Sequence, residues 1–164
     1  MAEPRWLTDR QLRTWQALLA VTTQLNRRIE QQLRDDAGLS HPQYEVLARL
    51  AAAGGELRMT ELAGAALASK SGLSYQVGQL EKTGLVGRRS CVSDDRGVIA
   101  YLTEPGWARL RAAAAGHAAL VGELLVDGLT PVQFTALGSA LDALEAHLRS
   151  AGQTRPTVVA TTTV

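Results

Sequence analysis

Cysteine, long apolar runs and net charge are all scarce in this chain. Its 164 residues include one cysteine, Cys91, which excludes an intrachain disulfide. No apolar run approaches the roughly 18 residues that a membrane-spanning helix needs, and the N-terminus lacks the basic segment and apolar core of a secretory signal. The formal net charge is only +1, so any basic surface must be local. We expect a cytoplasmic protein with no membrane partner.

Residue patterns typical of catalytic and metal sites are also missing. The three histidines, His41, His117 and His147, are far apart in the sequence and do not have metal-ligand spacing. Gly54-Gly55 is not followed by the lysine and hydroxyl residue of a phosphate-binding loop. The sequence therefore predicts no enzyme activity, no metal and no other cofactor. His117 falls on an apolar stripe, where a packed core histidine is the expected role.

Two helices are predicted before the centre of the chain. Thr8 has the spacing of a capping box with Gln11, and Gly38 is expected to end the helix that they begin. Its apolar residues recur at helical spacing: Leu12, Trp15, Leu18, Leu25, Ile29 and Leu33. Ser40 and Gln43 repeat the capping signal for a second helix, which is expected to run to about residue 53.

Two more helical stripes occupy the C-terminal third. The first contains Trp107, Leu110, Ala114, His117, Val121 and Leu124, and the second, after a break at 128–131, contains Leu137, Leu141, Leu144 and Leu148. The long terminal helices have more apolar surface than a small central module can cover. Two alternatives remain at this point: the helices pack on their own chain, or they form a dimer. Residues 151–164 lack a helical pattern, and we expect a disordered tail.

A helix-turn-helix is predicted between residues 60 and 82. Thr60 is a candidate N-cap with Glu61 in the first turn, a turn is expected at 68–70, and a second helix follows from Ser71. Its inward edge is formed by Leu73, Val77 and Leu80, and its outward face by Ser71, Tyr75, Gln79 and Lys82. Thr83-Gly84 is expected to end this helix with a left-handed cap.

A basic β-hairpin is predicted next. Residues 85–89 and 98–102 are short β-prone runs, and Ser93, Asp94, Asp95 and Gly97 supply turn-forming side chains between them. Arg88, Arg89 and Arg96 then lie on the arms and tip of one exposed ribbon, where guanidinium groups suit phosphates and narrow minor grooves. Any surface hairpin can carry arginines, so the charges alone leave a structural role open.

Together these motifs resemble the MarR (multiple antibiotic resistance regulator) family of winged-helix proteins. The residues that carry the resemblance are Leu62-Ala63, the run 80–86 leading to Arg88, Asp95-Arg96, and the run 102–106. Gly97 stands where the family commonly has a second wing arginine, which puts one wing contact in doubt. The pattern covers about residues 8 to 150.

The resemblance implies a mainly α fold, a winged helix-turn-helix with a short β-hairpin wing, flanked by long N- and C-terminal dimerisation helices. The implied division is a dimerisation helix at 1–38, a DNA-binding module at 39–104, dimerisation helices at 105–150, and the tail. A homodimeric transcriptional regulator, most simply a repressor, is expected, which binds double-stranded DNA with an inverted repeat. The residues expected at the DNA are Ser69, Lys70, Ser71, Ser74, Tyr75, Gln76, Gln79, Lys82, Arg88, Arg89, Asp95 and Arg96.

Regulation by a ligand is also expected from the resemblance. Members of the family commonly leave DNA when a small aromatic or phenolic molecule binds between the dimer helices and the winged module. Trp15, His41 and Tyr44 offer aromatic walls and polar tips for such a molecule, although all three also suit a core or an interface. Cys91 falls in the wing, where an incidental cysteine is the expected interpretation. The alternative function is a winged-helix module that binds proteins instead of DNA.

Overall fold

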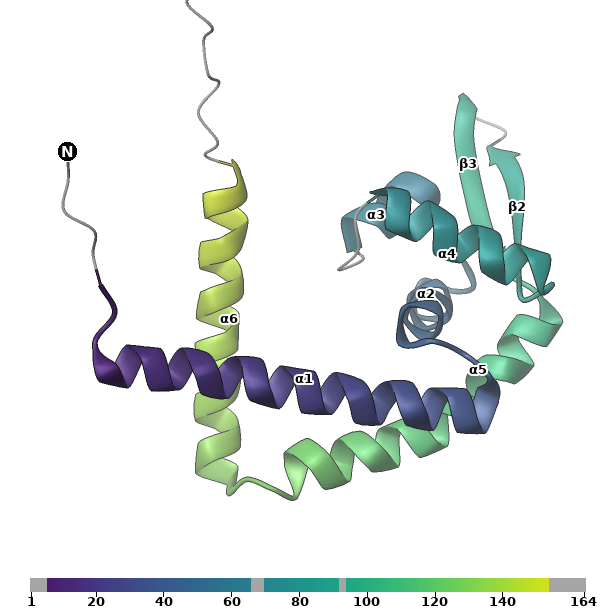
Figure 1. The fold of residues 1–164 in the computed structure, drawn as a ribbon. Coiled ribbons are helices and arrows are strands. Elements are labelled where there is room, and N and C mark those ends of the chain that lie inside the picture. The colour runs from purple at the N-terminus through teal and green to yellow at the C-terminus, as the bar shows by residue number, and fades with distance from the viewer. Residues whose placement is uncertain (1–5, 66–69, 92–93, 154–164) are drawn as a thin grey trace, which may run out of the picture. The chain divides into compact units, whose positions relative to one another are not determined.

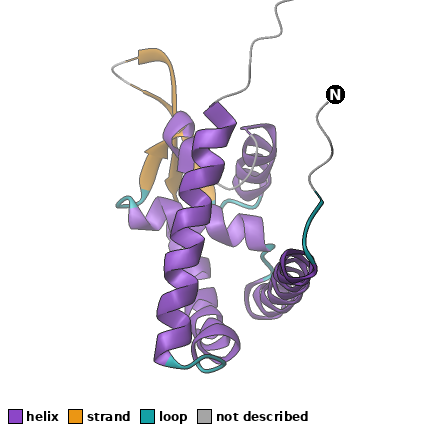
Figure 2. Ribbon diagram, turned by 90° about the vertical axis from the view of Figure 1, so that its left-hand side faces the viewer, coloured by secondary structure: helices purple, strands orange, loops and turns teal. Residues whose placement is uncertain are grey.

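The computed structural model describes residues 6–65, 70–91 and 94–153, with the backbone alone at 65, 70, 94–96 and 151–153. The chain divides into two compact units, one ending at Val121 and the other beginning at Gly122. The mainly α fold is confirmed, with helices along most of the described chain and one small antiparallel sheet, drawn in orange in Figure 2. The predicted division by function into segments ending at residues 38, 104 and 150 stays a prediction.

The two N-terminal helices begin and end where the sequence predicts. Helix α1 spans Asp9–Ala37 and α2 spans His41–Ala52, and both start with complete capping boxes, from Thr8 and from Ser40. Gly38 ends α1 with φ of 63°, a left-handed conformation that glycine adopts without strain. Because only Gly38, Leu39 and Ser40 separate the helices, the direction of α2 is set closely by the end of α1.

The helix-turn-helix consists of α3 (Met59–Ala65) and α4 (Lys70–Lys82). Thr60 was the wrong cap, because α3 already begins at Met59. The Glu61 carboxylate instead accepts a hydrogen bond from the Arg58 backbone N–H at 3.1 Å, so Glu61 satisfies the start of the helix from within its first turn. The predicted turn at 68–70 lies largely outside the described residues. Gly84, with φ of 72°, follows α4 as predicted.

The sheet has three antiparallel strands in the order β1-β3-β2, formed by Glu56–Arg58, Asp94–Leu102 and Val86–Cys91. The hairpin is confirmed, but its predicted turn was too long, because β3 already begins at Asp94. The pairing shifts after the Ser90–Val98 pair, and the next pair is Cys91 with Asp94. Residues 95–97 therefore bulge out of the ladder while remaining in the strand, which explains how turn-forming side chains occur in strand backbone.

The core of the first unit lies where α2 meets the other elements. Helix α2 contacts α1 and α5 (Glu104–Val121) on one side and α3, α4 and β3 on the other (Figure 1). Fully buried leucines come from α1, α2, α3 and α4: Leu33, Leu47, Leu50, Leu62 and Leu80. Helices α1 and α5 thus pack on the winged module through the same apolar cluster.

The second unit contains a π-helical turn at Gly122–Val126 and helix α6, Pro131–Gln153. Thr130 caps α6, since its hydroxyl accepts a hydrogen bond from the Gln133 backbone N–H. Much of the apolar stripe of α6 is exposed in the single chain, and Leu148 is 61% exposed. Among the described residues no single helix is long and apolar enough to span a membrane; the interrupted pair 104–126 and 131–150 reaches that length and composition together.

Candidate nucleic-acid interface

Helix α4 buries one edge and exposes a polar face. Leu73, Val77 and Leu80 are almost completely buried, as predicted from their helical spacing. The opposite face carries exposed Ser71, Ser74, Tyr75 and Lys82, together with half-buried Gln76 and Gln79. Tyr75 is 63% exposed, so its ring is accessible to a binding partner. Helix α4 therefore presents hydrogen-bonding and stacking groups to its surroundings.

The β2–β3 ribbon beside α4 carries its two described arginines on opposite faces. Arg88 pairs with Ala100, which is buried, so Arg88 lies on the face of the sheet that meets the helices. Arg89 pairs with Ile99 on the outward face, where Glu56 of β1 also lies. The sequence placed both arginines on one exposed ribbon without separating these faces. Arg88 is consequently the arginine that lies nearest α4.

Arg88 is held against α4 by Glu81. The Nε and Nη2 groups of Arg88 both donate to Oε2 of Glu81, with the Nε bond at 2.9 Å. This hydrogen bond holds the pKa of the Glu81 carboxyl below its usual value and raises the pKa of Arg88. The ion pair joins the last turn of α4 to the first half of β2. It therefore fixes the ribbon relative to α4.

Arg89 makes the corresponding contact on the outward face. Its Nη2 lies 2.7 Å from Oε2 of Glu56, and this hydrogen bond raises the pKa of Arg89. The two residues come from the two outer strands, so the ion pair bridges across β3. Tyr101 closes the same face, because its ring lies over Gly87 where a side chain would collide with it. The outward face thus carries an ordered polar surface at the base of the ribbon.

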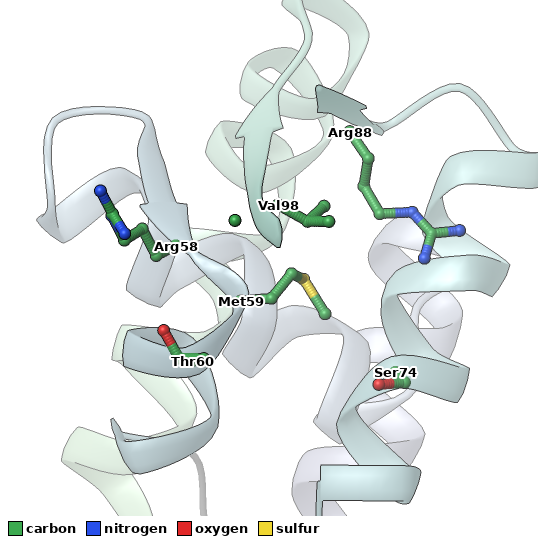
Figure 3. A pocket seen from close by; sticks show the side chains of 7 residues that line it. Arg58, Met59, Thr60, Ser74, Arg88 and Val98 are labelled. Atoms are coloured by element: carbon green, nitrogen blue, oxygen red, sulfur yellow. The ribbon is translucent and has the colours of Figure 1, made fainter. Parts of the chain in front are cut away.

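A cleft of about 320 Å³ opens between α3, α4 and the ribbon. Arg58 and Thr60 line it on one side and Ser74 and Arg88 on the other (Figure 3). Met59 and Val98 lie between these two pairs of polar residues. Its described lining residues include two arginines and two hydroxyl residues but no acidic residue, and the Arg58 guanidinium points away from Met59 and Val98 (Figure 3). Such a donor-rich cleft is chemically suited to phosphate oxygens.

Several predicted site residues cannot be placed in this geometry. Ser69 lies outside the described residues, and so do the side chains of Lys70, Asp95 and Arg96. The structure adds residues that sequence reasoning missed, namely Glu56 and Arg58 of β1 and Glu81 of α4. A three-residue strand shows too little alternation to be found in a sequence. The spacing of seven residues between Glu81 and Arg88 predicts a contact only once the turn between them is known.

The predicted ligand residues come together only in part. His41 and Tyr44 of α2 meet His117 of α5, with ring centroids 6.4 Å and 4.6 Å from that of His117. Burial, followed by the charge of His41, lowers the pKa of His117, and burial raises the pKa of Tyr44. Among the described residues Nδ1 of His117 is buried without a hydrogen-bond partner. We call these three residues the aromatic cluster.

Trp15 does not reach the aromatic cluster within one chain. The cluster meets α1 near Glu30, whose carboxylate accepts a hydrogen bond from the His41 backbone N–H at 2.7 Å. Trp15 lies fifteen residues earlier on the same helix, roughly 22 Å away along its axis. The Trp15 side chain is 51% exposed instead. Cys91, in the wing as predicted, is buried.

Comparison with known proteins identifies the architecture. The family model described as the MarR family matches residues 37–97. Sco3205, a MarR family transcriptional regulator from Streptomyces coelicolor solved in complex with DNA, is 40% identical, with a TM-score of 0.85 over 90% of this chain and 93% of that one. AbsC, another MarR family regulator from Streptomyces coelicolor, is 39% identical, with a TM-score of 0.85 over 90% of this chain and 99% of its own.

A more distant similarity extends over the whole chain. The organohalide-sensing regulator RdhR-CbdbA1625, solved with 2,4-dichlorophenol bound, is 17% identical, with a TM-score of 0.80 over 100% of this chain and 99% of its own. At this identity the similarity shows the fold alone. A search among curated protein sequences gave no match. The family and these structural neighbours are transcriptional regulators, not enzymes.

Proposed function

Because this chain belongs to the MarR family of winged-helix transcriptional regulators, we propose that it is a homodimeric repressor that binds an inverted repeat in duplex DNA and leaves it when a small aromatic or phenolic molecule binds. The observation that carries this proposal is the polar, exposed face of α4 beside a donor-rich cleft and a basic ribbon. A 40% identical neighbour was solved in complex with DNA, which supports the same use of these surfaces here.

The DNA-binding proposal assigns different roles to the two surfaces. Helix α4 enters the major groove, where Gln76 and Gln79 read adenine edges and Ser71 holds a phosphate. The cleft takes a phosphate oxygen between Ser74 and Arg88. Salt titration of duplex binding tests the proposal: affinity should fall steeply as salt rises. Absence of DNA binding at low salt would instead favour a winged-helix protein that binds other proteins.

Two substitutions separate sequence reading from phosphate contact. Gln79→Ala should change the preferred sequence more than the affinity for random duplex. Arg88→Gln should weaken binding to all sequences and reduce the salt slope by about 0.9. Arg111→Gln is the matched control, because Arg111 is exposed on α5 and its ion-pair distance to Glu104 is as long as 3.5 Å. Equal effects of Arg88→Gln and Arg111→Gln would exclude a specific phosphate contact by Arg88.

The wing tip is assigned to the minor groove on the basis of the family resemblance. Arg96 is proposed to enter that groove, with Asp95 holding the ribbon or its arginines in place. Arg96→Ala should weaken binding by about 1–3 kcal/mol while the melting temperature is unchanged. An unchanged affinity at moderate salt would remove the wing tip from the mechanism.

The dimer proposal rests on apolar surface that the chain leaves open. On α1, Leu12, Trp15 and Leu19 are each more than 40% exposed, although they continue the stripe that is buried at Leu33. On α6, Leu141, Leu144 and Leu148 are similarly exposed. A stable monomer rarely leaves such rows of large apolar side chains in water. A second copy that covers the terminal helices would also present two α4 helices to one DNA duplex.

Charged residues on the open face of α1 test the dimer. Trp15→Glu combined with Leu19→Glu should give a folded monomer, because neither side chain belongs to the core of the single chain. Arg13→Glu is the control on the same helix. Sedimentation velocity should find monomer only in the double variant, and operator affinity should fall with it, since two linked half-site contacts act at high effective concentration. A dimeric double variant would place the interface elsewhere.

The aromatic cluster is proposed as the effector site, at the packing contact between α5 and α2. Nδ1 of His117, which has no hydrogen-bond partner in the described part of the chain, and the Tyr44 hydroxyl offer hydrogen bonds to a phenol or an aromatic acid. The fold binds 2,4-dichlorophenol in RdhR-CbdbA1625. To release DNA, such a ligand would have to bind more tightly to the form of the dimer in which the distance between the two α4 helices does not match the DNA grooves. A tenfold preference, about 1.4 kcal/mol per site, becomes roughly a hundredfold loss of DNA affinity over two sites.

A compound panel tests this assignment. Phenols and aromatic acids are titrated against tryptophan fluorescence and against the protein–DNA complex, for the natural chain and for Tyr44→Ala. The proposal expects DNA release by at least one compound and a weaker response from Tyr44→Ala. Equal release from both proteins would move the site away from Tyr44.

A further inference from the structure

A second cavity lies where four elements of the first unit meet. Residues at the end of α1, the start of α2, the end of α4 and the second turn of α5 line a volume of about 150 Å³, which is open to solvent at the exposed Arg109. Its apolar wall is formed by Leu39, Leu80 and Leu85, which are 2%, 1% and 5% exposed. No member of the aromatic cluster is among its described lining residues. The cavity is therefore distinct from the proposed effector site.

The polar side of this cavity is rich in hydrogen-bond donors. Arg109 donates through Nη1 to the Ala37 carbonyl at 2.6 Å, and within the described part of the chain this is its one hydrogen bond. Its Nε and Nη2 groups are thus left for another acceptor. Gln43 uses its Oε1 to accept the Ser40 backbone N–H at 2.9 Å, which leaves its NH₂ group as a donor. The capping box of α2 thereby fixes which end of the Gln43 amide is available.

The composition of the lining selects the charge of a ligand. Arg109 supplies a positive charge, and the described lining contains no acidic side chain. A carboxylate would pair with two guanidinium N–H groups and take a further hydrogen bond from Gln43. An apolar chain attached to that carboxylate would lie against the three leucines. The volume is below the roughly 300 Å³ of the smallest drug-sized pockets, so only a few non-hydrogen atoms fit.

We propose that this cavity binds a short-chain monocarboxylate. The ligand bridges Arg109 of α5, which already bonds to the end of α1, and the C-terminal end of α4, represented by Leu80 and Thr83. A bound carboxylate would therefore contact the end of α4, the helix whose polar face is proposed to read DNA. The proposal goes beyond the DNA-binding and effector functions above. A direct binding measurement tests it whether or not those functions are correct.

The first experiment uses the full chain and defined probes. Acetate, propionate and butyrate are titrated at constant ionic strength and followed by ¹H–¹⁵N NMR, with propionamide as the uncharged control. We expect saturable shifts of the Arg109 Nε–H and the Gln43 side-chain amide, and binding of propionamide at least tenfold weaker than that of propionate. Shifts that never saturate with any of the three carboxylates would overturn the proposal.

Two variants then locate the site by different means. Arg109→Lys keeps the positive charge but removes the paired donors, and should weaken propionate binding by about tenfold or more. Thr83→Met places a larger apolar side chain at the exposed rim and should have the same effect by filling the cavity. Arg111→Lys, on the same helix, is the matched control and should bind propionate normally. Normal propionate binding by both Arg109→Lys and Thr83→Met would show that the carboxylate binds elsewhere.

Discussion

The ion pair between Glu81 and Arg88 makes a prediction in which stability and DNA affinity change in opposite directions. Glu81→Gln removes the negative charge that now holds Arg88, while keeping the size of the side chain. The two side chains are 38% and 37% exposed, so solvent screens much of their attraction. The free energy of unfolding should therefore fall only slightly, and the melting temperature should hardly change.

The DNA affinity of Glu81→Gln should rise. Arg88 lines the cleft between α3 and α4, where the Glu81 carboxylate compensates the charge of the guanidinium that is proposed to contact a phosphate. Without the Glu81 charge that contact carries one more uncompensated positive charge, which steepens the slope of log K against log salt by about 0.9. A fourfold rise in salt would then cost the variant roughly 3.5-fold more affinity than it costs the natural chain.

Fluorescence anisotropy with a labelled random duplex measures both slopes. Glu45→Gln is the matched control, because Glu45 pairs with Arg49 within α2 at 2.6 Å and lines neither the cleft nor the ribbon. The control should keep the natural slope. If Glu81→Gln also keeps that slope, Arg88 does not meet a phosphate and the assignment of the cleft is wrong.

Two further predictions concern stability. A Cβ at Gly106 would lie 2.0 Å from the Leu85 carbonyl oxygen, so Gly106→Ala should lower the free energy of unfolding by about 1–3 kcal/mol in urea denaturation. Gly78→Ala is the comparison: a Cβ at Gly78 meets open space, and this variant should raise the free energy of unfolding by about 0.5–1 kcal/mol. An unchanged stability of Gly106→Ala would contradict the close packing of α5 on the backbone at Leu85. Burial and the charge of His41 lower the pKa of His117, so the unfolded chain binds the proton more readily than the folded chain, and stability should fall as pH drops below about 6.5. The stability of His117→Leu, measured by urea denaturation, should fall less than that of the natural chain between about pH 7.5 and 5.5. An identical pH dependence of the two proteins would contradict the buried placement of His117.

Local signals in the sequence were sufficient for the two N-terminal helices and for the end of α4, but not for the start of α3. The capping boxes at Thr8 and Ser40 and the glycines at 38 and 84 act through atoms within a few residues, so their effects can be deduced without knowing the fold. The inward edge of α4 was likewise predictable, because helical spacing alone places Leu73, Val77 and Leu80 on one side. Spacing also predicted that Ser71, Tyr75 and Lys82 are exposed, whereas Gln79 on the same predicted face is half-buried.

Contacts between distant segments could not be deduced in this way. The pair Arg89–Glu56 spans 33 residues, and it exists because β1, a strand of three residues, joins the outer edge of β3. The opposite orientation of Arg88 and Arg89 follows from strand alternation, but it needs the register of the sheet. The turn-forming side chains at 94–97 predicted a turn, whereas these residues belong to strand β3, and 95–97 bulge out of its pairing with β2. The aromatic cluster required the packing of α5 on α2, which brings His117 to Tyr44.

Selection of duplexes from a random DNA pool by the full-length protein tests the central claim most directly. Two α4 helices presented by a homodimer should enrich sequences with an inverted repeat, whose half-site centres lie roughly 10 base pairs or one helical turn apart. Binding to the enriched duplex should also be lost when one half-site is scrambled. Enrichment of a single unrepeated site, or no enrichment at low salt, would contradict the account of this protein as a dimeric reader of DNA.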